Sequence, residues 1–147
     1  MKLVAKILAV LAAALVAIQF VPVRPTNPPV TSPWTLEGPA KEVLVRACFD
    51  CHSHETRLPW YGKLAPASWL LAYDMKEGRA HLNFSAWAEW PAEKQKRRIH
   101  EIGEEVQEGE MPPALYTFMH PKAKLSPGDK ATLAAWVLSQ TQGSPKK

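Results

Sequence analysis

The stretch Cys48-Phe49-Asp50-Cys51-His52 decides how this 147-residue chain is read. C-x-x-C-H is the spacing at which a c-type haem is attached. Residues three apart share one face of a helix, so the thiols of Cys48 and Cys51 can both reach the vinyl groups on one edge of the macrocycle. His52 follows directly and can bring its imidazole under the iron. The motif predicts one covalently attached haem c, with two thioethers and His52 as the proximal ligand.

Three other interpretations of the same cysteines are weaker. A redox dithiol would need a βαβ setting, which this chain lacks. A zinc site needs four ligands, yet Cys48, Cys51, His52 and His54 are crowded into seven residues with no second cysteine pair downstream. A disulfide between residues three apart would close a very short loop and stabilise little.

The iron's other axial ligand is predicted to be Met111. It lies in Glu108-Gly109-Glu110-Met111-Pro112-Pro113, where the chain leaves a helix at a glycine and is held extended by two prolines. A backbone restricted in this way suits an axial thioether ligand. Two alternatives stay open: a histidine, with His81 or His120 first, and an open or water-bound position.

Aromatic side chains supply the rest of the predicted pocket. Six tryptophans are many for so short a chain. Indole and phenol rings offer apolar surface to the macrocycle and N–H or O–H donors to its propionates. The predicted haem contacts are Trp60, Tyr61 and Trp69, with Arg79 as an ion-pair partner of a propionate. Ordinary core packing is the alternative for each ring, and no catalytic residue is predicted.

Residues 1–23 are predicted to be a signal anchor. Lys2 and Lys6 precede an apolar run over 7–23 that only Gln19 interrupts. The run is about as long as the shortest membrane-spanning helices, and no small-x-small pair follows it. We therefore expect an uncleaved anchor, with a removed signal peptide as the alternative. With both lysines held in the cytoplasm, the rest of the chain would face the periplasm or extracytoplasmic space.

Residues 24–39 are predicted to be a proline-rich linker. Prolines are too frequent there for a helix or an interior strand. Such linkers are extended and semi-rigid at about 3.1 Å per residue, so this one could hold a domain some tens of Å from the bilayer. The haem-binding domain is then expected over 40–143 and a flexible tail over 144–147.

The pattern of the domain is helical throughout. The predicted helices are one from Gly38-Pro39 to the haem motif, one over 67–77 that stops at Gly78, one from Pro91, and one from Ser126 to Gly143. The last has the clearest signals, with Ser126 as N-cap, Pro127 at the first helical position and Asp129 in the capping-box place. No segment alternates with period two. The fold class is therefore predicted as all-α: a cytochrome c-like bundle of about four helices around one haem, preceded by a transmembrane helix.

The charge distribution argues against a nucleic-acid-binding function. The formal net charge is +4, but five of the 18 basic residues lie in the N-terminal segment or the extreme tail. The other 13 stand against 14 acidic residues. No basic face remains for a nucleic acid.

Several short strings together resemble one family. The chain is similar to the small family of haem-binding-domain proteins with a single C-x-x-C-H, related in outline to class I cytochromes c. The resemblance implies a periplasmic haem-binding role, sometimes beside haem peroxidase or cytochrome modules. A long insertion, Ser53 to Trp90, departs from the class I pattern. The matching strings are Ile18-Gln19-Phe20, Arg24-Pro25, Asn27-Pro28, Cys48 to His54, Pro59-Trp60-Tyr61, Pro66-Ala67-Ser68-Trp69, Gly78-Arg79, Leu82-Asn83-Phe84-Ser85, Trp87, Gly109-Glu110-Met111-Pro112 and Trp136.

Three functions follow as hypotheses. In the first, His52 and Met111 both bind iron, no position is left for a substrate, and the protein carries electrons to redox partner proteins at the same membrane. In the second, the sixth position is open or displaceable and the protein is a haem sensor or a peroxidase-like enzyme, with histidines as distal acid–base groups. In the third, the protein is a haem-bearing assembly factor.

Overall fold

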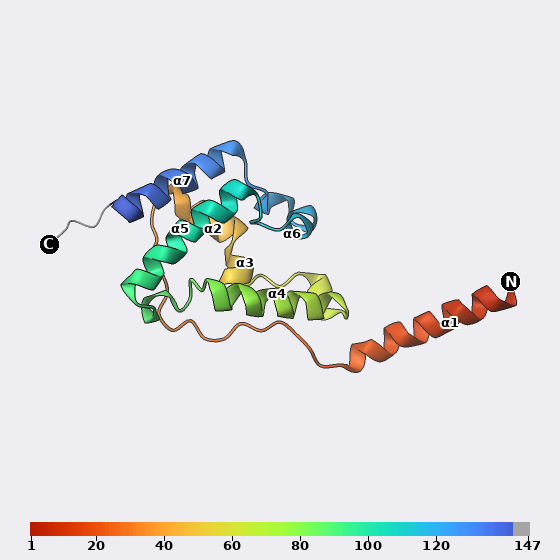
Figure 1. Cartoon of the computed structure of the whole chain (residues 1–147). Coiled ribbons are helices and arrows are strands. Elements are labelled where there is room, and N and C mark those ends of the chain that lie inside the picture. Colours follow the sequence, from red (N-terminus) through yellow and green to blue (C-terminus); the bar gives the residue numbers. More distant parts are fainter. Residues whose placement is uncertain (143–147) are drawn as a thin grey trace.

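The computed structural model describes residues 1–142, which form seven α-helices and no β-strand (Figure 1). The α-helices are α1 (Lys2–Ala17), α2 (Pro39–Ala47), α3 (Phe49–His52), α4 (Ala67–His81), α5 (Ala92–Glu108), α6 (Ala114–Met119) and α7 (Pro127–Gln142). Four 3₁₀ turns are η1 (Ile18–Phe20), η2 (Trp60–Lys63), η3 (Trp87–Glu89) and η4 (Pro121–Ala123). The predicted all-α class is confirmed. The predicted tail at 144–147 and the predicted helix end at Gly143 lie outside the described residues.

Helix α1 stands away from the rest of the molecule (Figure 1). Together with η1 it forms a 19-residue helical segment, Lys2–Phe20, with a mean hydropathy of 2.4, and none of it is buried against the protein. A helix this long and apolar could cross a membrane, and a signal sequence near the N-terminus would have the same character. Both predictions for this segment therefore remain compatible with the structure.

The core lies between α2, α5 and α7. Leu44 of α2 and Leu133 of α7 have no exposed surface, and Val106 of α5 is 3% exposed. Helices α5 and α7 cross closely at Gly103, where an added Cβ would lie 3.4 Å from the Val137 side chain. This packed layer forms the scaffold on which α3 and α4 are placed.

The proline-rich segment is part of the domain. Trp34 stacks on Trp87 with ring centroids 4.3 Å apart and planes 15° apart, and it also packs against Phe84. The Trp34 backbone N–H donates to the Phe84 carbonyl at 2.8 Å, and that of Ser32 donates to the Ser85 carbonyl at 3.1 Å. The chain between α1 and α2 is extended, as predicted, but it lies along the domain.

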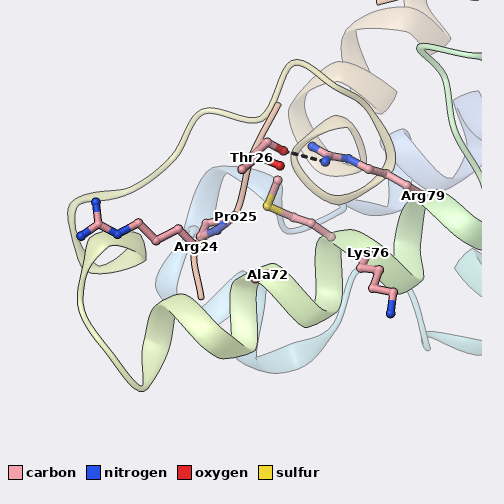
Figure 2. A pocket seen from close by; sticks show the side chains of 7 residues that line it. Arg24, Pro25, Thr26, Ala72, Lys76 and Arg79 are labelled. Carbon is pink, nitrogen blue, oxygen red and sulfur yellow. Dashed lines mark hydrogen bonds between the residues drawn. The ribbon is translucent and has the colours of Figure 1, made fainter. Parts of the chain in front are cut away.

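Side chains fix the earlier part of the same segment. Arg79 of α4 donates to the Thr26 carbonyl at 2.7 Å and to Asn27 Oδ1 at 3.0 Å, and Figure 2 shows its guanidinium directed at Thr26. Asn27 in turn donates to the Thr56 carbonyl at 2.9 Å. The prediction of a spacer that holds the domain at a distance is therefore wrong. The proline content of a segment predicts that it is stiff, but it does not predict which surface the segment packs on.

Two predicted helix limits are also wrong. The first helix breaks at Cys48 (φ −120°, ψ −33°), so α2 ends at Ala47 and the haem motif lies on the separate short helix α3. The second helix does not stop at Gly78 but continues to His81. The glycine has another role there, described below.

The other two predicted helices are confirmed, and one was missed. Helix α5 follows Pro91 and buries the predicted face of Ile99, Ile102 and Val106. Helix α7 begins with the predicted capping box, in which Ser126 Oγ accepts from Asp129 N at 3.1 Å and Asp129 Oδ2 accepts from Ser126 N at 2.8 Å. Helix α6 was not predicted, because six residues after two prolines show too little periodicity.

Candidate haem site

The two cysteines of the motif are free thiols at the start and within α3. Burial raises the pKa of Cys48 to about 12. Burial, followed by the nearby carboxylates of Asp74 and Asp50, raises the pKa of Cys51 to about 11. Both thiols are therefore protonated near neutral pH, whereas a reactive redox dithiol needs a lowered pKa. The environment argues against that alternative.

His52 is oriented by the end of α4. Its Nδ1 lies 2.9 Å from the Gly78 carbonyl oxygen and 3.1 Å from the Leu82 carbonyl oxygen. Since both partners can only accept, Nδ1 carries the proton and donates to them. Burial lowers the pKa of the imidazole, although the two carbonyls oppose this effect. The ring is thus neutral, with Nε2 as a lone-pair donor. A metal-ligating histidine is held in this way in most metal sites.

Gly78 makes that arrangement sterically possible. A Cβ at this position would lie 2.8 Å from the backbone oxygen of Cys51 and 3.3 Å from its carbonyl carbon. Only a residue without a side chain allows α4 to approach α3 so closely. The close approach brings the Gly78 carbonyl to His52, so the glycine that the sequence marked as a helix end is instead part of the site.

Asp50, between the two cysteines, connects the motif to its surroundings. Its side chain is nearly buried, and Oδ1 accepts from the Arg57 backbone N–H at 3.0 Å while Oδ2 accepts from the Tyr116 hydroxyl at 2.8 Å. Burial and this hydrogen bond raise the pKa of Tyr116. The Asp50 backbone carbonyl also accepts from Thr56 Oγ1 at 2.6 Å. Sequence reasoning missed Asp50 and Tyr116, because the x positions of C-x-x-C-H carry no rule.

Tyr61 and His120 form a second polar contact. The Tyr61 hydroxyl oxygen lies 2.5 Å from His120 Nε2, within hydrogen-bonding distance, and the His120 ring stacks on Tyr116 with ring centroids 4.5 Å apart. Burial raises the pKa of Tyr61, as do the nearby Asp50 and Cys51. Tyr61 therefore lies near the motif, as a haem contact should. His120 uses Nε2 for Tyr61, so in this arrangement that nitrogen is not available to a metal.

The two remaining predicted aromatic contacts differ from each other. The indole Nε1 of Trp69 is buried and has no hydrogen-bond partner within residues 1–142. A buried N–H without a partner is costly, and a propionate oxygen would satisfy it. Trp60 is 75% exposed, and its ring packs edge-on against the Tyr61 ring with the ring centroids 5.8 Å apart. Its haem contact stays a prediction.

Arg79 has its guanidinium occupied by the protein. Besides Thr26 and Asn27, it donates to the Ser53 carbonyl at 2.8 Å and to Thr56 Oγ1 at 3.1 Å. It therefore joins α4, the loop after the haem motif and the proline-rich segment. A propionate contact for Arg79 stays a prediction.

Met111 follows the left-handed Gly109 (φ 82°) that ends α5. Its backbone N–H donates to the Glu105 carbonyl at 3.2 Å, and the residue is 37% exposed. The contacts described here do not join it to His52, so its role as an iron ligand stays a prediction. Met75, by contrast, is 2% exposed and belongs to the core, as expected.

His54, in the loop after the motif, has hydrogen-bond partners at both of its ring nitrogens. His54 Nδ1 donates to the Pro29 carbonyl at 2.8 Å, while its Nε2 accepts from Asn83 Nδ2 at 3.0 Å. Both ring nitrogens have partners, so His54 holds the proline-rich segment on the domain.

These observations fit a haem. His52 offers a lone pair, two thiols lie on the same short helix, and Trp69 has a buried donor to satisfy.

Comparison with known proteins agrees with this chemistry. The model of the haem-binding domain family matches residues 13–139. The cytochrome c peroxidase Ccp of Escherichia coli (strain K12) is 30% identical over 100 residues. That match covers 65% of this chain and 21% of the relative, so the chain spans about a fifth of the relative's length. No solved structure matches the chain.

Proposed function

Because the chain belongs to the haem-binding domain family, we propose that it carries one covalent haem c and transfers electrons at the outer face of the cytoplasmic membrane. The observation that carries the proposal is the orientation of His52. Two main-chain carbonyls accept from its Nδ1–H and so fix the tautomer, and burial lowers the pKa of the imidazole, so Nε2 has the lone pair that an iron ligand needs.

In this proposal Cys48 and Cys51 would hold the haem through thioethers, and His52 and Met111 would bind its iron. When bound, haem supplies one-electron chemistry at its iron, and methionine ligation raises the reduction potential.

The protein's own residues maintain this setting. Gly78 and Leu82 present the carbonyls that fix the imidazole. Asp50 ties α3 to α6 through Tyr116, which limits movement of the motif. Trp69 would donate its indole N–H, which is buried without a partner among residues 1–142, to a propionate. The Tyr61 hydroxyl is already hydrogen-bonded to His120.

The proposed location follows from α1. An apolar helix with Lys2 at its N-terminal end would remain in the bilayer with the lysine in the cytoplasm, which leaves the haem domain outside. The expected partners are redox proteins at the same membrane.

A haem sensor or a peroxidase-like enzyme is the second candidate. The similarity to a cytochrome c peroxidase favours it, and so does the exposure of Met111, which suits a displaceable ligand. In that case the hydrogen-bonded pair of Tyr61 and His120 would supply groups that hold or move a proton.

Optical spectra of the oxidised and reduced protein, with and without carbon monoxide, separate the two candidates. Met111→Ala should abolish the methionine-ligated spectrum and let the reduced protein bind carbon monoxide readily. Met119→Ala is the matched control, because Met119 is exposed to a similar degree, 47% against 37%. If reduced wild type binds carbon monoxide readily and Met111→Ala leaves the spectrum unchanged, the carrier proposal is wrong.

Covalent attachment needs a separate experiment. Replacing both Cys48 and Cys51 by serine should abolish the haem that remains on the chain after denaturation. Haem retained by this double variant would refute the thioether model.

A further inference from the structure

The end of α1 is attached to a loop of the domain 46 residues away. Gln19 Nε2 donates to the Ala65 carbonyl at 3.0 Å, and the Ala65 N–H donates to Gln19 Oε1 at 3.0 Å. Gln19 Nε2 also donates to the Leu15 carbonyl within the helix at 2.9 Å. Because the amide makes both bonds of a pair with one backbone residue, it fixes both the position and the orientation of that loop. The only polar side chain in the apolar run therefore has a partner in the domain.

The position of Gln19 sets the height of the loop above a bilayer. The 19 residues of Lys2–Phe20 rise about 1.5 Å each and span about 28 Å, close to the thickness of the hydrocarbon core. The long side chains of Lys2 and Lys6 reach back along the helix, which keeps their ammonium groups at the cytoplasmic headgroups. Gln19 is the penultimate residue, so it lies where the hydrocarbon meets the headgroups. A loop bonded directly to it must lie at the same depth.

The side chains beside this attachment have the composition of an interfacial surface. Phe20 is 82% exposed, Trp60 75% and Leu64 49%. Lys63 is exposed on the same turn, η2. Tryptophan, aliphatic residues and lysine together are typical of segments at the boundary between hydrocarbon and headgroups.

A second cation lies just after the membrane exit. Arg24 lines a cavity between the proline-rich segment and α4, but its guanidinium extends away from Arg79 and Lys76 (Figure 2). No hydrogen bond or ion pair of Arg24 occurs among the described residues. Four residues after Phe20, such a side chain can reach lipid phosphates.

We propose that the surface made by Phe20, Trp60, Lys63 and Leu64 is a second membrane contact, seated in the outer interface of the lipid bilayer. This inference rests on the anchor role proposed for α1. Lys63 and Arg24 would pair with lipid phosphates, while the apolar side chains enter the headgroup boundary. The domain is then held in one orientation on the bilayer, and α7 lies on the side away from the end of α1 (Figure 1).

The test places a photo-crosslinking residue, benzoylphenylalanine, at position 64 of the full haem-loaded chain in nanodiscs of phosphatidylglycerol and phosphatidylcholine. Position 138 on α7 is the matched control, since Leu138 is 55% exposed and Leu64 is 49% exposed. Mass spectrometry should find phospholipid adducts at position 64 several-fold above those at position 138. Equal yields would overturn the proposal, and so would adducts at position 64 that join two copies of the chain.

A second variant tests the attachment itself. Gln19→Leu removes both bonds to Ala65 but keeps α1 apolar, so lipid adducts at position 64 should fall several-fold. An unchanged yield would refute the role of Gln19. Alkaline carbonate extraction separates the two levels of the argument: if the wild-type chain is released from membranes, the anchor proposal fails together with this inference. If it stays and position 64 finds no lipid, only the inference fails.

Discussion

Replacing Gly78 by alanine should loosen the contact between α3 and α4. The new Cβ would meet the Cys51 backbone oxygen at 2.8 Å and its carbonyl carbon at 3.3 Å, both inside ordinary contact. Backbone atoms cannot rotate away as a side chain can, so one helix must shift. Overpacking of this kind costs about 1–3 kcal/mol.

Helix propensity acts in the opposite direction. Alanine is favoured over glycine by about 1 kcal/mol inside a helix. With a clash against backbone at the upper end of the overpacking range, the net destabilisation is about 1–2 kcal/mol. For a domain of about 100 residues, that lowers the melting temperature by about 4–16 °C.

The chain offers a matched control in Gly103→Ala. Gly103 is also inside a helix, but its Cβ would meet only Val137 side-chain atoms, at 3.4 Å or more. The Gly103→Ala variant has the same gain in helix propensity without the clash, so it should be as stable as the wild type or more stable. Melting of both haem-loaded variants in detergent, followed by circular dichroism, measures the difference. If Gly78→Ala melts as high as Gly103→Ala, the close approach of α4 to Cys51 does not constrain the site as argued.

Three further substitutions address other contacts. Asp50→Ala leaves the Tyr116 hydroxyl and the Arg57 backbone N–H without their acceptor, so the free energy of unfolding in urea should fall by about 1–3 kcal/mol. A fall of less than about 0.5 kcal/mol would contradict this role of Asp50. Trp34→Ala removes a ring stacked on Trp87 and should cost about 3 kcal/mol, whereas a nearly neutral result would mean that the proline-rich segment does not support the core. Asp129→Ala removes the capping box of α7 and should cost about 1 kcal/mol at neutral pH. The Ser126 backbone hydrogen bond, the largest cause, lowers the pKa of the Asp129 carboxyl below its ordinary 3.8. The contribution of the carboxylate is therefore present above that value and lost as pH falls through the lower folded pKa, so the variant and wild type should converge in acid. A difference that does not shrink as the pH falls below 3.8 would contradict the carboxylate's part.

The sequence was sufficient for features that depend on local spacing. The face of α5 and the capping box of α7 follow rules that span a few residues, and the structure confirms both. The family match agrees with a haem-binding chain, while the thioether roles of Cys48 and Cys51 stay predictions. The apolar N-terminal helix could also be predicted from the sequence, because its length and composition alone define it.

Features that depend on contacts between distant segments were not predictable in this way. Local sequence rules predict a helix end at Gly78 because glycine often marks one, while its role in the structure depends on Cys51, 27 residues earlier. The partner of Asp50 is Tyr116 on a helix too short to show periodicity. The packing of the proline-rich segment depends on Arg79, His54 and the aromatic core, none of which its own sequence reveals.

The docking of the proline-rich segment bears on how a water-soluble version of this protein would be cut. A truncation that starts at Pro39, where α2 begins, removes Trp34 from its stack and takes Thr26 and Asn27 from Arg79. It would leave an arginine beside the haem-motif loop with two of its partners gone. Truncation from Pro25 onward keeps all of these contacts and discards only the apolar helix and its exit. The minimal folding unit is thus longer than its helices suggest.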